Sequence, residues 1–403
     1  MSRWEEKHLG DICDSIYSGG TPSTAFPEYW DGEFYWLSSG ETSQRFIFAT
    51  EKTISQQGID HSSTRLAKQN DVVIACAGQG KTRGQVSVLK RDMYINQSVI
   101  ALHPNANNLY YGFLFYNLLM RYEEIRYYSD ASSTRGSITT DMLKKLKISI
   151  PEFPTQKQIA DIISTYDDLI ENNNYRIALL EQAAQELYKE WFVRLRFPGH
   201  ECTKCENGLP IGWGLKRMND FCYVTDGTHD TPKPVDCGVP LVTGKCISNG
   251  FVDFNIAYNI SQGDHQKIKK RSGLKTGDII FSNIGTVGNC CIVYYDREFS
   301  VKNVIIFKPD TMTKAVFLYY WMTSTTMQEI FSMQTNGASQ QFVSLSFMRS
   351  YKVLIPEPEV LDAFGEKIIP LIEQKRLINQ QNINLAKQRD LLLPRLMSGK
   401  LEV

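Results

Sequence analysis

No apolar stretch of this 403-residue chain is long enough to cross a lipid bilayer. A membrane-spanning helix needs about 20 consecutive apolar residues, and the best run here, near Ala315–Met322, is far shorter. The first residues, Met1–Lys7, also lack the apolar core of a secretory signal. We therefore expect a cytoplasmic protein.

The sequence offers little for a disulfide framework or a metal site. Its nine cysteines are odd in number and scattered, so we expect reduced thiols. Only Cys202 and Cys205, beside His200, have a metal-like spacing, and no second ligand pair lies at a suitable distance. Zinc there remains an alternative to reduced cysteines in a linker, and the sequence favours the linker and no bound metal.

Net charge is absent as well, because 44 Lys and Arg residues balance 44 Asp and Glu residues. Overall charge is a weak guide to nucleic-acid binding, since phosphate contacts depend on where basic residues cluster. Lys267, Lys269, Lys270 and Arg271 form one such cluster. DNA contact and an ordinary solvated loop are equally good interpretations of it.

Linear motifs of catalysis are also missing. The sequence has no Asn/Asp-Pro-Pro-aromatic motif of an amino-methyltransferase, no His-Glu-x-x-His and no Gly-x-Ser-x-Gly. Ala75–Thr82 nearly matches a nucleotide-binding loop, but that loop needs a helix after it, and Arg83–Leu89 has the pattern of a strand. We predict that Gly78–Gly84 is a hairpin tip, three residues longer than its counterpart Gly285–Gly288.

An internal repeat is the main positive feature of the sequence. Four blocks recur in the same order with a slowly drifting offset. They are Leu9–Ile12 with Met218–Phe221, 209 residues apart; Asp71–Ile74 with Asp278–Phe281, 207 apart; Tyr94–Pro104 with Phe299–Pro309, 205 apart; and Lys147–Pro151 with Lys352–Pro356, 205 apart. Chance does not readily preserve both order and offset, so the chain contains two copies of one unit.

Each copy begins with about 150 residues in which short apolar runs alternate with Gly, Pro, Asn and Asp. The predicted strands are Tyr35–Leu37, Val72–Cys76, Val86–Leu89, Val99–Leu102, Ile279–Phe281 and Val304–Phe307. Helices are predicted at Tyr110–Tyr122 and Lys314–Phe331. These patterns indicate α+β domains with many surface loops.

After Pro151 and Pro356 the apolar residues follow a heptad spacing of four and three, which keeps them on one helical stripe. In the first copy they are Ile159, Ile163, Tyr166, Ile170, Ile177, Leu180, Ala184, Leu187 and Trp191. In the second they are Phe364, Ile368, Leu371, Ile378, Leu385, Leu392 and Leu396, with polar Lys375, Asn382 and Arg389 between them. We predict two long helices, the first about 37 residues and about 55 Å long.

The simplest way to bury both stripes is to pair the helices antiparallel as a coiled coil. Asn173 and Asn382 within the stripes either fix the register or mark where a stripe reaches solvent. Pro370 is expected to kink the second helix or delay its start.

The fold class we expect is α+β: two β-rich domains joined by two long antiparallel helices, with an internal pseudo-two-fold repeat. The predicted domains are residues 1–151 and 198–356, and the predicted helical spacers are 152–197 and 357–403.

Several segments, in this order, resemble the specificity subunits of type I restriction–modification systems. They are Leu9–Ile12, Ser18–Ser23, Tyr29–Gly32, Tyr35–Gly40, Ile150–Ile159, Asn207–Trp213, Ile355–Pro356 and the tail Arg389–Leu401. Each motif is loose, but the ordered set is specific and spans the chain. The long Gly78–Gly84 loop and the Cys202/Cys205 pair depart from the family pattern.

The resemblance implies that each β-rich domain is a target-recognition domain for one half of a bipartite, asymmetric DNA site. It implies that the helices space the domains and dock two methyltransferase subunits, and that two restriction/translocase subunits complete the enzyme. The chain itself would be non-catalytic and bind no cofactor, with S-adenosylmethionine, ATP and magnesium held by the partner subunits.

We expect polar loop residues to contact DNA, because Arg and Lys suit guanine edges and phosphates while Asn and Gln suit adenine. The candidates in the first copy are Ser18, Thr21, Ser23, Gln79, Lys81, Arg83, Gln85, Ser133 and Arg135. Those in the second are Thr228, His229, Lys233, Thr243, Lys245, Asn283, Thr286, Gln340 and Gln341. Ordinary turn residues are the alternative for each of them.

Two rival functions remain open from the sequence. One is a self-contained DNA-modifying or ATP-using enzyme, which rests mainly on Gly80-Lys81-Thr82. The other is a two-headed DNA-binding scaffold without a methyltransferase partner.

Overall fold

The computed structural model describes residues 4–78, 80–132, 136–295, 297–335 and 342–403. The chain forms two compact units. Unit 1 comprises Met1–Asn172 and Gln381–Val403, and unit 2 comprises Asn173–Gln380. Among the described residues, no helix is both long and apolar enough to span a membrane.

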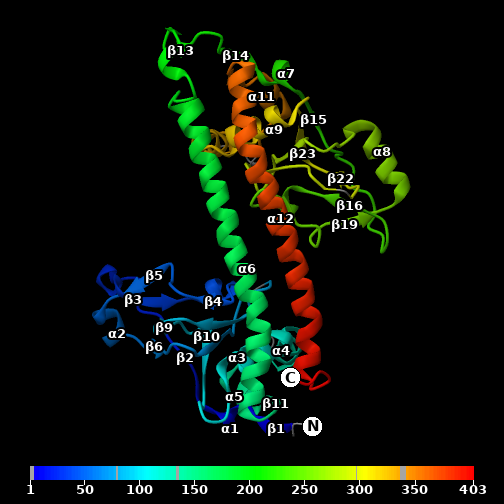
Figure 1. The fold of residues 1–403 in the computed structure, drawn as a ribbon. Helices are drawn as coiled ribbons and strands as arrows, with labels where there is room; N and C mark the ends of the chain where they lie inside the picture. The colour runs from blue at the N-terminus through cyan, green and yellow to red at the C-terminus, as the bar shows by residue number, and fades with distance from the viewer. Residues whose placement is uncertain (1–3, 79, 133–135, 296, 336–341) are drawn as a thin grey trace. The chain divides into compact units, whose positions relative to one another are not determined.

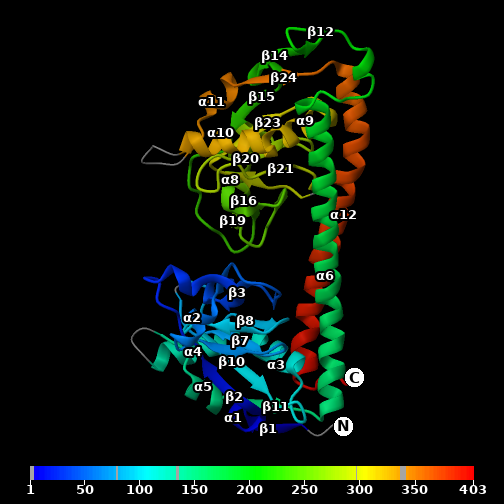
Figure 2. The same ribbon diagram turned by 90° about the vertical axis from the view of Figure 1, so that its left-hand side faces the viewer.

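Unit 1 is built on a five-stranded sheet in the order β2-β10-β7-β8-β4. Figure 2 labels its first four strands, β2, β10, β7 and β8. Its strands are β2 (Cys13–Ser18), β10 (Val99–Pro104), β7 (Val72–Ala75), β8 (Val86–Leu89) and β4 (Phe46–Ile47). Every residue of β7 and β8 is buried, because one face of the sheet packs on helix α3 (Tyr111–Met120) and the other on a second sheet. That burial explains why these strands are apolar throughout instead of alternating.

The second sheet of unit 1 has the order β5-β3-β9-β6, with β3 and β9 parallel. Its strands are β5 (Lys52–Ile54), β3 (Trp30–Leu37), β9 (Met93–Ile95) and β6 (Arg65–Ala67). A short ladder of β1 (Glu5–His8) with β11 (Lys147–Ile150) brings the first strand of the unit to the last one before the long helix.

Unit 2 has corresponding sheets. The order β15-β23-β20-β21 matches β2-β10-β7-β8, and β19-β16-β22 matches β5-β3-β9, again with a parallel pair in β16 and β22. The strands are β15 (Tyr223–Asp226), β23 (Val304–Lys308), β20 (Ile279–Ser282), β21 (Cys290–Ile292), β19 (Tyr258–Ile260), β16 (Val239–Val242) and β22 (Ser300–Val301). Strands β14 (Gly214–Arg217) and β24 (Lys352–Ile355) form the short ladder. All six predicted strands are confirmed.

The predicted helix at Lys314–Phe331 is wrong as a single helix, although Tyr110–Tyr122 does contain α3. The chain forms α9 (Met312–Thr323) and α10 (Thr325–Thr335) instead. Ser324 separates them in an extended conformation, and its hydroxyl accepts a hydrogen bond from the backbone N–H of Met327 at 3.4 Å. A serine that caps the following helix competes with helix continuation.

Two long helices run through both units. Helix α6 (Phe153–Tyr188) continues into one π-helical turn (Lys189–Val193), and α12 spans Pro358–Met397 (Figure 1). Helix α12 continues through Pro370, so the expected delay of its start is wrong. The residues around the proline, including Phe364, Ile368 and Ile372, are buried in the core of unit 2, and this packing offsets the lost backbone hydrogen bond.

Parts of α6 and α12 share a hydrophobic core within each unit. In unit 1 Ile159 and Ile163 lie in one core with Leu393 and Leu396. In unit 2 the shared core contains Tyr188 and Trp191 from the α6 end, together with Phe364, Ile368 and Ile372 from α12.

The buried apolar residues of the predicted stripes are Ile159, Ile163, Ala184, Trp191, Phe364, Ile368, Ile378 and Leu396. The partly buried ones are Tyr166, Ile170, Ile177, Leu180, Leu187, Leu371, Leu385 and Leu392. Asn173 and Asn382 are both buried, so the alternative that the stripes reach solvent there is wrong.

Candidate nucleic-acid interface

The first candidate loop of each unit follows the strand β2 or β15. In unit 1 Gly19 passes so close to β9 that an added Cβ would lie 1.8 Å from the carbonyl oxygen of Ile95. In unit 2 a Cβ on Gly227 would lie 2.5 Å from the carbonyl oxygen of Val301. Only glycine fits such an approach, so the two units lead the chain out of the sheet in the same way.

In unit 1 this loop carries the predicted residues Ser18, Thr21 and Ser23. Thr21 and Ser23 are exposed, and the Thr21 hydroxyl donates a hydrogen bond to the side-chain oxygen of exposed Gln97. The structure therefore brings Gln97, which the sequence reasoning missed, to the predicted loop. Its position two residues after β9, in the repeated block Tyr94–Pro104, was the available signal.

In unit 2 the equivalent loop carries His229, whose ring lies between two polar partners. Nδ1 is 3.1 Å from the side-chain oxygen of Asn303, and Nε2 is 2.8 Å from a carboxylate oxygen of Asp226. Arg271 donates to the other oxygen of Asp226 at 2.7 Å. Burial opposes the ionisation of Asp226, but the hydrogen bonds from His229 and Arg271 outweigh it and hold the pKa of Asp226 below its ordinary value.

Thr228 and Lys233 differ in whether their side chains are exposed for contact with DNA. Thr228 is buried, and its hydroxyl accepts a hydrogen bond from the backbone N–H of Asp230 at 3.1 Å, so its side chain shapes the loop and does not face a ligand. Lys233 is exposed. Lys302 donates to the hydroxyl of exposed Thr231, which brings a cation that the sequence reasoning missed to this loop.

The second candidate loop of unit 1 is the predicted hairpin tip. Strands β7 and β8 pair antiparallel, so the hairpin is confirmed, and strand β8 stands where a nucleotide-binding loop would need a helix. The loop rests on α4 (Tyr122–Ser132), because the Tyr122 hydroxyl donates to the Lys81 carbonyl at 2.8 Å and Arg126 donates to the Gly80 carbonyl at 2.6 Å.

Within that tip, the Lys81 side chain is exposed but Arg83 is not. The Arg83 guanidinium is buried and donates to Asp130 and to the carbonyl of Gly136. Because Arg83 is buried, its charge is paired with Asp130 and two of its nitrogens donate inside the unit, we correct the expectation that Arg83 contacts DNA. Gln85 is partly buried, with its side-chain oxygen 3.4 Å from the Thr42 hydroxyl.

The matching loop of unit 2 brings four predicted residues together. The Thr286 hydroxyl donates to the carbonyl of Gly244 at 3.0 Å, which joins the β20–β21 tip to the short 3-10 helix Gly244–Cys246. Lys245 and Thr286 are exposed, whereas Thr243 and Asn283 are partly buried. The side-chain amide of Asn283 already donates a hydrogen bond inside the unit, to the carbonyl of Val343 at 3.1 Å.

Some predictions fall outside the described residues, namely Gln79, Ser133, Arg135, Gln340 and Gln341. The basic cluster at Lys267–Arg271 lies on helix α8 (Gln262–Ser272) and not in a loop. Lys267 pairs with Asp264 at 3.4 Å, Lys269 pairs with Glu298, and Arg271 pairs with Asp226. These carboxylates offset the charge that would attract phosphates.

Unit 1 also holds a buried polar cluster that the sequence reasoning missed, which we call the Asp167 cluster: Arg45, Tyr116, Asp167 and Arg389. Asp167 lies on α6 and accepts hydrogen bonds from Arg45 at 2.8 Å, from the Tyr116 hydroxyl at 2.8 Å and from Arg389 of α12 at 2.6 Å. Burial, and then the charge of Asp167, raise the pKa of Tyr116, so its hydroxyl remains a donor.

Unit 2 holds a similar group, the Glu181 cluster: Glu181, Gln185, Tyr320 and Lys375. Glu181 of α6 accepts hydrogen bonds from Lys375 of α12, from Gln185 at 3.2 Å and from the Tyr320 hydroxyl of α9 at 3.3 Å. The signal for both clusters was the polar gaps at Lys375 and Arg389 in the second stripe, which the sequence reasoning treated only as a weaker stripe.

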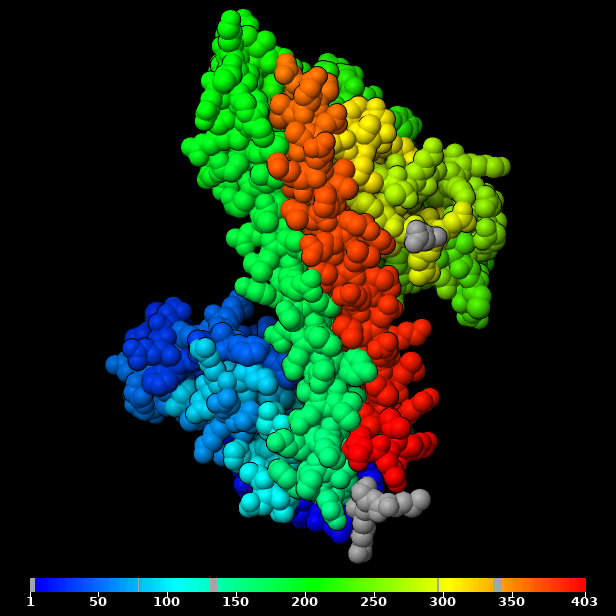
Figure 3. All heavy atoms as spheres, viewed as in Figure 1, coloured from blue at the N-terminus to red at the C-terminus, as the bar shows by residue number. Residues whose placement is uncertain are grey.

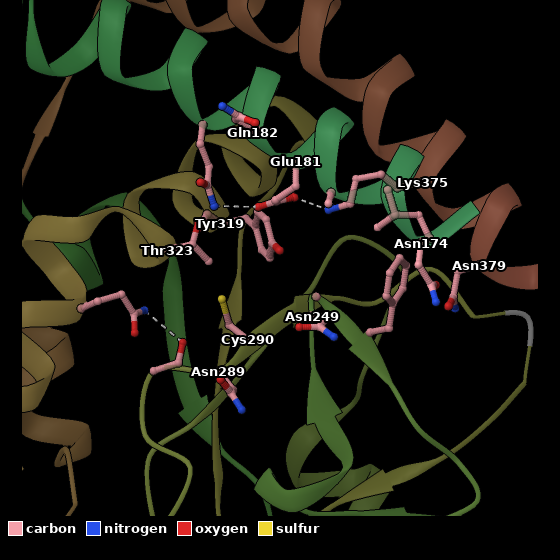
Figure 4. A pocket seen from close by; sticks show the side chains of 17 residues that line it. Asn174, Glu181, Gln182, Asn249, Asn289, Cys290, Tyr319, Thr323, Lys375 and Asn379 are labelled. Carbon is pink, nitrogen blue, oxygen red and sulfur yellow. Dashed lines mark hydrogen bonds and ion pairs between the residues drawn. The ribbon is translucent and has the colours of Figure 1, made fainter. Parts of the chain in front are cut away.

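Three residues of the Glu181 cluster, Glu181, Gln185 and Lys375, line a cavity of about 690 Å³ within unit 2. Figure 4 shows Lys375 and Glu181 pointing toward each other there. Amide side chains dominate the remaining lining: Asn174, Gln182, Asn249, Asn289, Gln328 and Asn379. Among the described residues, no group of three or more His, Cys, Asp or Glu side chains has the geometry to hold a metal ion.

Comparison with known proteins gives a consistent picture. Residues 1–182 match the model of the type I restriction modification DNA specificity domain. The type I restriction enzyme MjaIX specificity subunit of Methanocaldococcus jannaschii is 26% identical over 425 residues, which cover 99% of this chain and 94% of that protein. The HindI specificity subunit of Haemophilus influenzae is 23% identical over 472 residues, which cover 100% of both.

A solved structure agrees at the level of the fold. The S subunit of a type I restriction–modification system from M. genitalium aligns with a TM-score of 0.60 at 17% identity, over 98% of this chain and 96% of that one. Residues 1–182 therefore match the type I restriction modification DNA specificity domain, and along almost its whole length the chain is similar to specificity subunits of type I restriction enzymes.

Proposed function

We propose that each unit of this specificity subunit carries one target-recognition domain, and that each domain reads one half of a bipartite, asymmetric DNA site. The observation that carries the proposal is that equivalent loops present different side chains on the same scaffold. After β2 the loop pairs Thr21 with Gln97, whereas after β15 it pairs His229 with Asn303. A shared backbone with different hydrogen-bonding groups is what two different half-sites require.

The two long helices act as the spacer between the domains, paired antiparallel as a coiled coil. Contacts inside each unit support this pairing, because residue numbers rise along α6 as those of their α12 partners fall. In unit 1 Ile163 shares a core with Leu393 and Asp167 bonds Arg389. In unit 2 Glu181 bonds Lys375. The corresponding sheets of the units and the four repeated blocks support an internal duplication with a pseudo-two-fold axis. Such an axis offers equivalent surfaces to two identical partners.

Those partners are two methyltransferase subunits, which dock on the helices, and two restriction/translocase subunits complete the assembly. The outer faces of α6 and α12 are open in both units (Figure 3). They carry exposed apolar side chains, which are costly in water and typical of interaction surfaces. These are Ile162, Leu169, Ile383 and Leu391 in unit 1 and Tyr175, Leu179 and Leu377 in unit 2.

The subunit itself is non-catalytic and binds no cofactor. S-adenosylmethionine, ATP and magnesium belong to the partner subunits. The hairpin at Gly78–Gly84 supports this view, since its backbone enters strand β8 and lacks the helix N-terminus that holds a nucleotide phosphate.

Co-expression with a methyltransferase subunit of a type I restriction–modification system from the source strain tests the proposal. We expect co-purification and, by methylation-sensitive sequencing, one adenine methylated per strand of a bipartite motif. Failure to co-purify would favour a DNA-binding scaffold. Methyl transfer, DNA cleavage or Lys81-dependent ATP binding by the chain alone would favour a self-contained enzyme.

A further inference from the structure

We propose that Asp167 and Glu181 are positioning residues that fix where each recognition domain is seated on the spacer, and thereby which gap between half-sites the enzyme accepts. This inference rests on the proposed function and adds the side chains that would make the spacing selective. Apolar packing is non-directional and tolerates small sliding movements, whereas buried hydrogen bonds to a charge do not.

In unit 1 the recognition domain reaches the α6 carboxylate from two separate elements. Arg45 comes from the residue before β4, and Tyr116 comes from α3, which packs on the central sheet. The side chain of Asp167 is only 4% exposed, so it depends on these donors and on Arg389. The neighbouring α6 positions on this face, Ile163 and Ile170, are apolar and could not accept the same bonds.

In unit 2 the recognition domain contacts the Glu181–Lys375 ion pair through a tyrosine hydroxyl and a tight turn. The Tyr320 hydroxyl bonds Glu181, and the Lys375 ammonium lies 5.8 Å from the ring centre of Phe251 and 5.7 Å from that of Tyr319. The turn before Phe251 needs Gly250, where an added Cβ would lie 2.5 Å from the Tyr319 hydroxyl. Burial, and then Glu181, raise the pKa of Tyr320, so its hydroxyl remains a donor.

The two clusters are not a by-product of the internal repeat. By the repeat offset of 205, the position in the second copy that corresponds to Asp167 is Ile372, and the position that corresponds to Glu181 is Ala386. Instead α6 supplies both acids, 14 residues apart, and α12 supplies both bases, Lys375 and Arg389, also 14 apart. A slip of α12 by one heptad that brings Ile368 to Glu181 would leave a carboxylate unpaired in a mostly buried site, which is strongly unfavourable.

The experiment uses the full chain in complex with its methyltransferase subunits. The substrates are duplexes that carry both half-sites with the native gap, or with a gap one base pair shorter or longer. Methyl transfer from labelled S-adenosylmethionine gives the ratio of rates at native and altered gaps. The variants are Tyr116→Phe and Asp167→Asn in unit 1 and Glu181→Gln in unit 2, with Asp168→Asn and Glu186→Gln as exposed α6 controls.

We expect the native-to-altered ratio to fall about tenfold in the cluster variants, because each loses a hydrogen bond that involves a charged group. The controls should keep the wild-type ratio. Tyr116→Phe removes a single oxygen atom and so keeps the test decisive even if Asp167→Asn folds poorly. In unit 2, the exchange Glu181→Lys with Lys375→Glu should recover more of the ratio than either single change.

A loss of stability alone would lower all rates together and leave the ratio unchanged. Cluster variants with the wild-type ratio would therefore overturn this inference while leaving the proposed function intact. A wild-type complex that methylates no bipartite site would contradict the proposed function itself.

Discussion

Arg389 of α12 donates a 2.6 Å hydrogen bond to Asp167 of α6, although 222 residues separate them in the sequence. Both side chains are buried, with 9% and 4% of their surface exposed. Tyr116 and Arg45 donate to the same carboxylate. Asp167 of α6 therefore bonds both to α12, near the end of the chain, and to the first β-rich domain.

Replacing Arg389 with alanine should destabilise unit 1 by about 2–4 kcal/mol. Removal of one partner from a buried ion pair costs about 3–5 kcal/mol, and Arg45 still offsets part of the charge that remains on Asp167. Urea denaturation of the full chain measures the change. Arg395→Ala, on the exposed side of the same helix, is the matched control, and equal losses in the two variants would contradict the role of the cluster.

Replacing Gly19 with alanine should destabilise unit 1 by more than about 2 kcal/mol, because the added Cβ would overlap the carbonyl oxygen of Ile95 and the backbone would have to move. Gly40→Ala provides the control, since its Cβ would meet no atom closer than 3.8 Å. The control should change stability by no more than about 0.5 kcal/mol. Thermal unfolding of both variants compares them, and a Gly19 variant as stable as the Gly40 variant would show that the loop does not require this close approach.

The loop after β15 should lose stability in acid. The pKa of Asp226 is lower in the folded chain than its ordinary value of about 3.9, so the stability it contributes is present above that value and is lost as the pH falls through the folded-state pKa. Hydrogen exchange of the Asp226–Thr231 amides, corrected for intrinsic rates, should show more opening at pH 3 than at pH 6. Asp226→Asn should reduce the difference in amide opening between pH 3 and pH 6. An unchanged difference in that variant would show that another group causes the effect.

Only the exposed thiols should react with an alkylating reagent in the native protein at neutral pH. These are Cys202, Cys205 and Cys237. Burial, and then Asp14 and Asp71, raise the pKa of Cys13 to about 12, while Cys290 and Cys291 are buried and their pKa values are raised mainly by that burial. Mass spectrometry before and after unfolding gives the labelled positions. Rapid native labelling of Cys290 would contradict the packing of the unit 2 core.

The sequence predicted the elements whose pattern is local. Unbroken apolar runs such as Val72–Ala75 are strands because both faces are buried, and the heptad spacing from Ile159 marked α6. The errors arose where tertiary contacts decide the outcome. Arg83 is a basic residue in a polar loop, which is typical of a DNA contact, but it forms an ion pair with Asp130, which lies 47 residues away in the sequence. Lys375 and Arg389 interrupt an apolar stripe, and only the fold shows that Glu181 and Asp167 face them.

The candidate loops were partly predictable for the same reason. Polar residues in segments rich in turn-forming residues located the loops, because turn chemistry is local. The partners Gln97, Lys302 and Asn303 follow other strands, so their place beside Thr21 and His229 depends on the order of strands in each sheet.

The central claim is that each domain reads one half of a bipartite site. The most direct measurement exchanges residues 1–150 for the matching domain of a relative and maps the methylated motif by methylation-sensitive sequencing. The account predicts that one half of the motif changes while the other half stays as in the wild type. A change in both halves would contradict it.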